Sequence, residues 1–463
     1  MQSRFRIVLI SFGLLLLGVL LGAFPRPYGA ASFVKQMIWP DNAEYSSVVT
    51  PTPVVTPTPV VTQTLVPSHF FIFEKLKFAA EIQYAYITGT KTRYLLGLSP
   101  DSQIEGLLGG ANPVYKLSKI DAFNTSRGKV VGQTEINLAR DTDERFRILD
   151  IKTSNSDSSA SMTHIFIAYA STTADTKCRT LNVVSTKVAT LGIFKAEKLQ
   201  TWFRSPCFPA SSGTDLRLHQ SGGRLLEVRT EEKLGSTTGW YLTVGDFIKL
   251  ADSGVALSGE SRRLLGSLLK ISRPGEFSIV ADGFRNPQGI SYVNTPSGLS
   301  ILQTGHGPRG GDELNEISVG KNYGWPRYSY GTRYGPTDFY NAPDINNAAG
   351  DSQAPLFSWL PSIGPSVVHQ IKSPFLLNYW ADNSREGYGD VLVAGMGSET
   401  LYRLRIYEKR VVYSEPIFIG ARIRTLVEED SGHFYLGTDS GLLVLAPHQV
   451  WDTPKGAFID INE

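Results

Sequence analysis

The sequence predicts an all-β fold, namely a six-bladed β-propeller preceded by a single N-terminal transmembrane helix and a Pro/Thr-rich linker. The 463 residues include 44 Gly, 26 Pro and 20 Tyr, a composition that disfavours helices and suits strands and turns. A strand–turn–strand pattern also recurs six times, and an apolar run opens the chain. The expected domains are a membrane anchor or signal segment at 1–24, a stalk at 25–67 and the propeller at 68–463.

The apolar run covers residues 7–24, carries no charge and follows Arg4 and Arg6. Its length is about the minimum for crossing the ~30 Å hydrocarbon layer. The flanking arginines favour a cytoplasmic N-terminus, so the rest of the chain is expected on the extracytoplasmic face of the membrane. A cleaved signal peptide, which would release a secreted protein, stays open as the alternative, although its apolar region is typically about 7–15 residues long.

The stalk contains the unit TPTPVV twice within residues 48–67. Because proline fixes φ and removes a donor, this segment should be extended and semi-rigid. An anchor followed by a stalk indicates an oxidising compartment, in which Cys178 and Cys207, the two cysteines of the chain, are able to pair. Two unpaired thiols fit the sequence equally well.

Residues 68–463 exceed the ~250–300 residues at which one hydrophobic core usually stops growing. A second linker is missing, so a repeated unit is the better explanation; two β-sandwiches are the rival. Each repeat is a strand of large apolar residues, a turn and a strand rich in Leu, Arg or Lys, which suits a propeller blade. The copies lie at 93–97 with 114–117, 165–169 with 178–181, 240–246 with 264–270, 299–302 with 313–317, 390–395 with 401–404 and 433–437 with 441–445. Short helices are expected only at 74–81 and 261–269.

The charge balance excludes some classes of protein. There are 45 Lys+Arg against 43 Asp+Glu, and the net charge is +2, so a surface that follows nucleic-acid phosphates is not expected. Two cysteines cannot form a four-cysteine zinc site or an iron–sulfur cluster.

The densest motif joins RNPQG at 285–289, GHGPRGGDELN at 305–315 and GKNYGWP at 320–326. Its glycines allow backbone carbonyls to approach a ligand closely. Those carbonyls, with Asp312 and Glu313, are hard oxygen donors that suit Ca²⁺. A tight surface loop with solvated acids is the alternative interpretation of the loop taken alone.

Two further segments carry candidate chemistry. His219 lies in HQSGGRL and Asp246 in VGD, and a carboxylate that holds a histidine is the usual arrangement of a general base. Arg422 and Arg424 alternate on a predicted strand, so both guanidinium groups face one side and suit a polycarboxylate ligand.

These segments, together with WLPSIGPS and ARIR, resemble those of the soluble-type sugar dehydrogenases that depend on pyrroloquinoline quinone (PQQ), the glucose/sorbosone and aldose sugar dehydrogenase group. The resemblance runs from about His219 to Leu445 and is loose over 68–210. It implies a six-bladed propeller and an extracytoplasmic quinoprotein that oxidises an aldose at C1 to the lactone by hydride transfer to PQQ. Electrons would pass on to an unknown acceptor.

The resemblance also implies roles for individual residues. His219 would take the proton of the sugar C1 hydroxyl, Asp246 would orient it, and Arg285 would face the quinone carbonyls. The remaining cofactor contacts would be Asn286, Arg422, Arg424, Trp359 and Ser362. The metal ligands would be Gly307 and Pro308, whose carbonyls hold a Ca²⁺ at the quinone, and Glu313 and Tyr323, which belong to a second, structural Ca²⁺ site.

The chain departs from the family pattern at three places. Gly397 stands where a cofactor-binding Lys is common, Leu356 stands where an aromatic wall is expected, and 247–250 replace a Gly-rich stretch. A non-catalytic propeller that binds a carbohydrate or a protein at the cell surface therefore stays open. A metal-dependent hydrolase such as a lactonase is a third possibility, with His306 as its extra candidate ligand.

Overall fold

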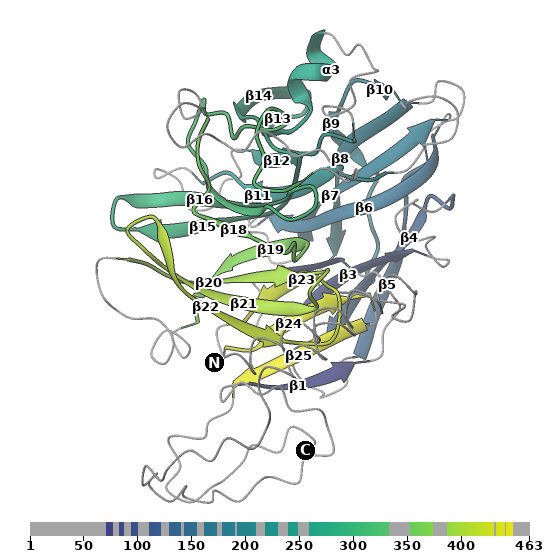
Figure 1. Cartoon of the computed structure of the whole chain (residues 1–463). Helices are drawn as coiled ribbons and strands as arrows, with labels where there is room; N and C mark the ends of the chain where they lie inside the picture. Colours follow the sequence, from purple (N-terminus) through teal and green to yellow (C-terminus); the bar gives the residue numbers. More distant parts are fainter. Residues whose placement is uncertain are drawn as a thin grey trace, which may run out of the picture. The chain divides into compact units, whose positions relative to one another are not determined.

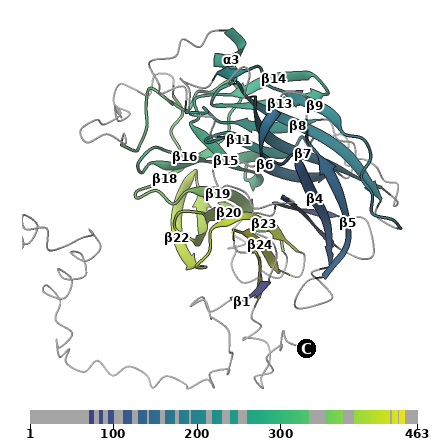
Figure 2. The same ribbon diagram turned by 90° about the vertical axis from the view of Figure 1, so that its right-hand side faces the viewer.

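The computed structural model describes the propeller strands and most of their connections. The described residues are 71–76, 83–87, 94–100, 111–121, 129–139, 143–154, 162–173, 178–189, 192–209, 218–229, 239–248, 259–332, 352–373, 387–429, 432–439 and 441–447. Their strands form six separate antiparallel sheets, so the predicted six-bladed propeller is confirmed. In Figure 2 the first strands β6, β11, β15, β19 and β23 lie near the middle of the ring, and later strands of each sheet lie further out.

The first three blades follow one another along the chain. The first contains β2 (Gln83–Ile87), β3 (Tyr94–Pro100), β4 (Val114–Asp121) and β5 (Lys129–Asn137). The second contains β6 (Asp143–Ser154), β7 (Met162–Thr173) and β8 (Cys178–Ala189), with the short strands β9 (Gln200–Arg204) and β10 (Phe208–Pro209) beside β8. The third contains β11 (Gly222–Glu227), β12 (Trp240–Val244), β13 (Ser267–Arg273) and β14 (Glu276–Ala281).

The last three blades complete the ring. The fourth contains β15 (Asn286–Thr295), β16 (Gly298–His306), β17 (Asp312–Glu316) and β18 (Phe357–Trp359). The fifth contains β19 (Pro365–Gln370), β20 (Gly387–Gly395), β21 (Thr400–Tyr407) and β22 (Arg410–Phe418). The sixth contains β23 (Ile423–Glu428), β24 (Phe434–Thr438), β25 (Gly441–Pro447) and β1 (Phe71–Leu76).

The sixth blade joins the two ends of the propeller. β1 pairs antiparallel with β25, from Phe71 opposite Pro447 to Leu76 opposite Leu442. In Figure 1 the purple β1 lies directly beside the yellow β25. A strand from the beginning of the chain therefore closes the ring through backbone hydrogen bonds.

The hydrophobic core lies between neighbouring blades. One cluster joins Leu96 and Leu117 of the first blade to Ile151 and Ile165 of the second, and all four are fully buried. A second cluster continues from Phe166 to Trp240 of the third blade. Strands in the middle of a blade are covered on both faces. Accordingly, ten of the twelve residues of β8 are buried, and Lys187 and Ala189 are partly exposed.

Two expectations about helices need correction. The predicted helix at 74–81 is wrong at its start, because Glu74–Leu76 belong to the ring-closing strand β1. The helix expected at 261–269 is present as α3 (Gly259–Leu264) but ends earlier, since Ser267 already begins β13. The predicted anchor at 7–24 and the stalk lie outside the described residues. Within the described part of the chain, no helix is long and apolar enough to span a bilayer.

Cys178 and Cys207 form a disulfide that ties the start of β8 to the segment before β10 across 29 residues of chain. We expect the double variant Cys178→Ala/Cys207→Ala to lose about 2–4 kcal/mol of unfolding free energy, because the cross-link restricts the unfolded chain. Urea denaturation followed by tryptophan fluorescence measures the loss. Reductant should destabilise the wild type and leave the variant unchanged; equal midpoints for both proteins without reductant would contradict the prediction.

Candidate active site

The candidate active site is a cavity of about 300 Å³ at one mouth of the ring. Its wall is built from the beginnings of inner strands and the loops beside them, which come from five different blades. The described side of the wall consists of Arg147, Leu149, Leu218, His219, Gln220, Ser221, Arg285, Asn286, Gln288, His306, Gly307, Pro308, Asp312, Ser362, Gly364, Met396, Arg422 and Arg424. Eight of the predicted site residues therefore meet in one place: His219, Arg285, Asn286, Gly307, Pro308, Ser362, Arg422 and Arg424.

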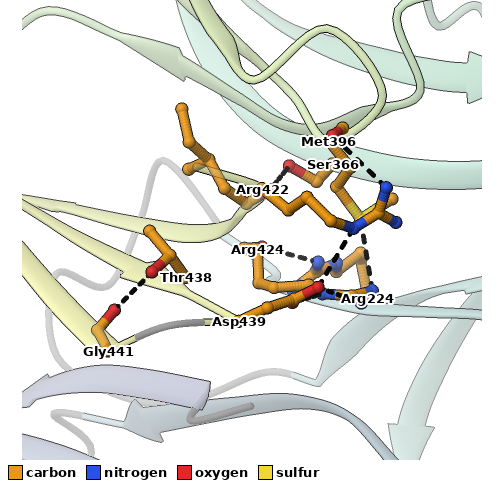
Figure 3. A network of polar contacts seen from close by, with 9 residues as sticks. Arg224, Ser366, Met396, Arg422, Arg424, Thr438, Asp439 and Gly441 are labelled. Atoms are coloured by element: carbon orange, nitrogen blue, oxygen red, sulfur yellow. Dashed lines mark hydrogen bonds and ion pairs between the residues drawn. The ribbon is translucent and has the colours of Figure 1, made fainter. Parts of the chain in front are cut away.

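Arg422 and Arg424 meet at the carboxylate of Asp439, as Figure 3 shows. The Nε atom of Arg422 lies 3.0 Å from Oδ2, and the Nε atom of Arg424 lies 2.6 Å from Oδ1. Met396 adds its carbonyl to Arg422 at 3.4 Å and its sulfur to Arg424 at 3.2 Å. One carboxylate thus holds two guanidinium groups, which leaves this part of the wall positively charged.

A buried ion pair lies next to Arg424 of the cavity wall. Arg224 of β11 approaches Asp150 of β6 to 3.6 Å. It also donates to the carbonyl of Arg424 at 2.9 Å, and Figure 3 shows these two arginines side by side. Both charged side chains are almost completely buried, at 8% and 2% exposure. Since these contacts connect three inner strands, they fix the backbone of Arg424 in the cavity wall.

Arg285 is held by neighbours on both sides. Its Nη1 donates to the carbonyl of Gly307 at 2.6 Å. In the amide orientation that satisfies both neighbours, Gln220 accepts from Arg285 and donates to Oδ1 of Asp246, each at 2.6 Å. The guanidinium also lies 5.5 Å from the ring centre of Trp325. A hydrogen-bonded chain therefore connects the cavity wall to the carboxylate behind it.

Asp246 lies behind the wall rather than in it, with 1% exposure. It accepts from the indole of Trp325 at 2.8 Å and from the backbone of Ile248 at 2.9 Å. Burial raises the pKa of Asp246 to about 6, against the opposing charge of Arg285. Asp246 thus contacts Gln220, which directly follows His219 in the sequence. That Asp246 orients the imidazole stays a prediction.

Asp312 organises the rim of the cavity. Its buried carboxylate accepts hydrogen bonds from Gly307 N at 3.0 Å, Ser362 Oγ at 3.2 Å, and the backbone nitrogens of Ile363 and Gly364 at 2.7 Å each. These donors belong to two loops of adjacent blades, after β16 and before β19. One side chain thus fixes the two loops that present Gly307 and Ser362 to the cavity.

His306 also lines the wall, at the end of β16. Its Nε2 lies 2.7 Å from the carbonyl of Pro365. Because a carbonyl only accepts, Nε2 carries hydrogen and Nδ1 is the nitrogen that is able to gain a proton. Burial lowers the pKa of His306, and the neighbouring Asp312 opposes that change. Its ring is therefore a neutral member of the wall near pH 7.

A second, smaller cavity of about 20 Å³ lies beside the first and holds the predicted residues Glu313 and Tyr323. Burial raises the pKa of Glu313 to about 7, and its carboxylate accepts from the Asn315 amide at 3.2 Å. Asn315 is 1% exposed, and its Oδ1 has no hydrogen-bond partner among the described residues. The Tyr323 hydroxyl serves the fold, since it donates to the carbonyl of Glu316 at 2.6 Å.

Trp359 is not brought to the cavity. It is 6% exposed and packs in a hydrophobic cluster with Leu314 and Ile363 between the fourth and fifth blades. The prediction that Trp359 lines the cofactor face is therefore not supported, because its ring is used in packing. Gly397 lies beside Met396, and a Cβ atom there would stand 3.1 Å from the carbonyl of Ile363, so the backbone leaves little room for the missing Lys.

The architecture and this cavity agree with the comparison to protein families. The family model described as glucose/sorbosone dehydrogenase matches residues 147–445, which is more than half of the chain. The chain belongs to the glucose/sorbosone dehydrogenase family. It is thereby a member of an oxidoreductase family, as the resemblance implied.

Individual relatives extend this result. Aldose sugar dehydrogenase YliI of Escherichia coli is 27% identical over 206 residues, which cover 40% of this chain and 52% of that protein. The apo crystal structure of the soluble aldose sugar dehydrogenase of Escherichia coli superposes with a TM-score of 0.58 at 20% identity, over 81% of this chain and 99% of that one. The PQQ-bound aldose sugar dehydrogenase of Streptomyces coelicolor gives 0.50 at 18% identity, over 81% and 98%. The first curated relatives are matched over only 35% and 52% of their own lengths.

Sequence reasoning missed several residues of this glucose/sorbosone dehydrogenase family site. Arg147 lies in the loosely matching part of the chain, and no motif marked it. Gln220 sits inside the HQSGGRL segment, where only His219 drew attention. Asp312 was noted as an oxygen donor for Ca²⁺, whereas its oxygens accept protein hydrogen bonds. A buried acid at the start of a short strand was the available signal, but three of its four partners are 50 to 52 residues away.

Proposed function

We propose that this protein is a quinoprotein that oxidises an aldose at C1 to the lactone by hydride transfer to PQQ. The observation that carries the proposal is the single cavity in which His219 and Arg285 meet Arg422 and Arg424. These residues span the third, fourth and sixth blades, so their meeting is a product of the fold rather than of local sequence.

The charge of the cavity wall suits the charge of the cofactor. Four guanidinium groups and one carboxylate are present among its described residues, and PQQ is a planar trianion. The paired Arg422 and Arg424 suit its carboxylates, because guanidinium groups bind carboxylates through parallel hydrogen bonds. When bound, the quinone would accept the hydride from the sugar.

The protein would supply the proton acceptor and the polar environment. His219 would take the proton of the C1 hydroxyl as general base. Arg285 and Asn286 would donate hydrogen bonds where negative charge develops. Oδ1 of Asn286 already accepts from Gly222 N at 3.3 Å and from Gln288 at 2.9 Å, so its amide nitrogen is the group left to donate.

Calcium fits the two predicted positions to different degrees. The small cavity suits a cation, because it is lined by the partly buried carboxylate of Glu313 and by Asn315, whose buried Oδ1 has no hydrogen-bond partner among the described residues. The carbonyl of Gly307 holds the Arg285 guanidinium at 2.6 Å, so it would become a Ca²⁺ ligand only after Arg285 turns away. Among the described residues, no group of three or more His, Cys, Asp or Glu side chains gathers, whereas the lactonase alternative calls for several carboxylate and His ligands around one metal.

We expect Ca²⁺ to raise the Tm of the protein by about 3 °C or more through Glu313, since a ligand that binds only the folded state stabilises it. The pKa of Glu313 is about 7, so protons compete with the metal below that pH. The rise should therefore be larger at pH 8 than at pH 6 and should vanish in Glu313→Gln. Thermal scans with Ca²⁺ and with chelator measure it. An equal rise in Glu313→Gln would place the ion elsewhere.

We propose an extracytoplasmic location, tethered through residues 1–24, and the disulfide between Cys178 and Cys207 supports an oxidising compartment.

A non-catalytic propeller is the second candidate, because Gly397 offers no cofactor-binding ammonium group. The test is reconstitution of the full chain with PQQ and Ca²⁺, followed by fluorescence titration of the quinone and a dye-linked assay with several aldoses. Saturable quinone binding and aldose-dependent dye reduction are expected. Failure to bind the quinone would favour the non-catalytic candidate.

A further inference from the structure

Arg147 brings a fourth guanidinium group to the cavity from a blade that the predicted site does not include. It lies on β6, the inner strand of the second blade, and shares the cavity face of that strand with Leu149 two positions on. Its Nη1 donates to the carbonyl of Leu218 at 3.2 Å. Since Leu218 directly precedes His219, this hydrogen bond anchors the guanidinium beside the proposed base.

The position of Arg147 separates it from the proposed cofactor contacts. Arg422 and Arg424 come from the sixth blade and Arg285 from the fourth. β6 instead adjoins β11, the strand after His219, through a hydrogen bond of 2.9 Å from Leu225 N to Asp150. The sugar must place its C1 hydroxyl near His219, so Arg147 borders the sugar rather than the far side of the cavity.

The cavity wall is strongly cationic and poor in stacking surface. The one carboxylate among its described residues, Asp312, already accepts four hydrogen bonds from the loops around it. No Phe, Tyr or Trp occurs in the described wall, and Trp359 is packed in the core. Small-molecule sites are usually lined by apolar and aromatic groups with a few polar ones. Among the described lining residues, the groups able to recognise a polar substrate are therefore charged side chains and hydrogen-bonding groups.

We infer that the substrate is an anionic aldose, a sugar that carries a carboxylate away from C1, and that Arg147 binds this carboxylate. The inference rests on the proposed function and names its substrate class. A guanidinium group presents its N–H donors in a planar fork and binds a carboxylate through two parallel hydrogen bonds. The reaction leaves the carboxylate unchanged: C1 loses a hydride to the quinone and its hydroxyl loses a proton to His219, so the hemiacetal becomes a lactone.

The test compares D-glucuronate with D-glucose on the full chain loaded with PQQ and Ca²⁺. The wild type should show a kcat/KM at least tenfold higher for glucuronate. Arg147→Met should lower the ratio of the two kcat/KM values at least tenfold, mainly by raising KM for glucuronate. Arg145→Met is the matched control, because Arg145 lies on the same strand outside the cavity; it should leave the ratio unchanged.

Calorimetry with D-glucarate, an oxidised dianionic analogue, gives a readout that does not depend on turnover. Arg147→Met should weaken its binding at least tenfold, with or without the quinone. A wild-type preference for glucose, or a ratio that Arg147→Met leaves unchanged, would overturn the inference and leave the proposed function standing. Weaker quinone binding in Arg147→Met with an unchanged ratio would also overturn it, since Arg147 would then be a cofactor contact. Failure of the wild type to bind the quinone would instead overturn the proposed function, and glucarate binding would still decide for or against the anion site.

Discussion

Replacing His219 with alanine should lower kcat/KM for aldose oxidation by about 10²–10⁴-fold, the usual contribution of a positioned general base. His219 lines the cavity next to Gln220, which links to both Arg285 and Asp246. The loss should appear mainly in kcat, because the base acts on the proton of the bound sugar. The measurement is steady-state dye reduction, accompanied by fluorescence titration of the quinone.

The quinone titration separates loss of the base from loss of the site. His219→Ala should still bind PQQ, since the paired Arg422 and Arg424 are unchanged. His433→Asn is a suitable control, because His433 lies in the turn before β24 and not in the cavity wall. If His219→Ala retained more than a tenth of wild-type activity, the proton would have to leave through another group, for which His306 would be the first candidate.

Replacing Asp312 with alanine should cost at least about 3 kcal/mol of unfolding free energy, because four donors that now share its carboxylate would lose their acceptor. The loops that carry Gly307 and Ser362 would lose their common support. Quinone affinity should therefore fall together with stability, even though Asp312 itself is not a proposed cofactor contact. Denaturant unfolding and quinone titration of the same samples measure the two effects.

Glu276→Gln provides the matched control for a removed carboxylate. Glu276 pairs with Arg273, and both side chains are more than half exposed, so little stability should be lost. A small effect for both variants would mean that the loops of the rim are held by other contacts. For variants that fail to fold, Asp312→Asn retains the size of the side chain and keeps the experiment informative.

The fold could be predicted from the sequence because every blade contains a similar pair of buried strands. All six predicted repeats coincide with the second and third strands of a blade; for example, 390–395 and 401–404 fall within β20 and β21. These strands are covered on both faces, so their apolar residues are dense. Outer strands such as β22 have mostly exposed side chains and carry no such pattern. The predicted helix at 74–81 includes the end of the ring-closing β1, because the strand that pairs with β1 is far away in the sequence.

The site was predictable where a motif joins chemistry to a fixed backbone. The glycine-rich loop and the ARIR segment placed Gly307, Arg422 and Arg424 correctly at the cavity. Trp359 and Arg147 show the limit. Whether a tryptophan faces a ligand or the core depends on packing between blades. Whether an arginine contributes to the site depends on which strand lies next to its own strand.

The pairing of β1 with β25 sets an order of events during synthesis. β1 leaves the ribosome early, yet its partner at Gly441–Pro447 follows only after all other strands of the ring. The first five blades consist of consecutive segments and are able to form as they emerge. The nascent chain therefore exposes unpaired strand edges, which favour association with other chains until β25 has been synthesised. Translation that stopped before β25 would leave β1 without its pairing strand. Closure of the ring therefore depends on β25.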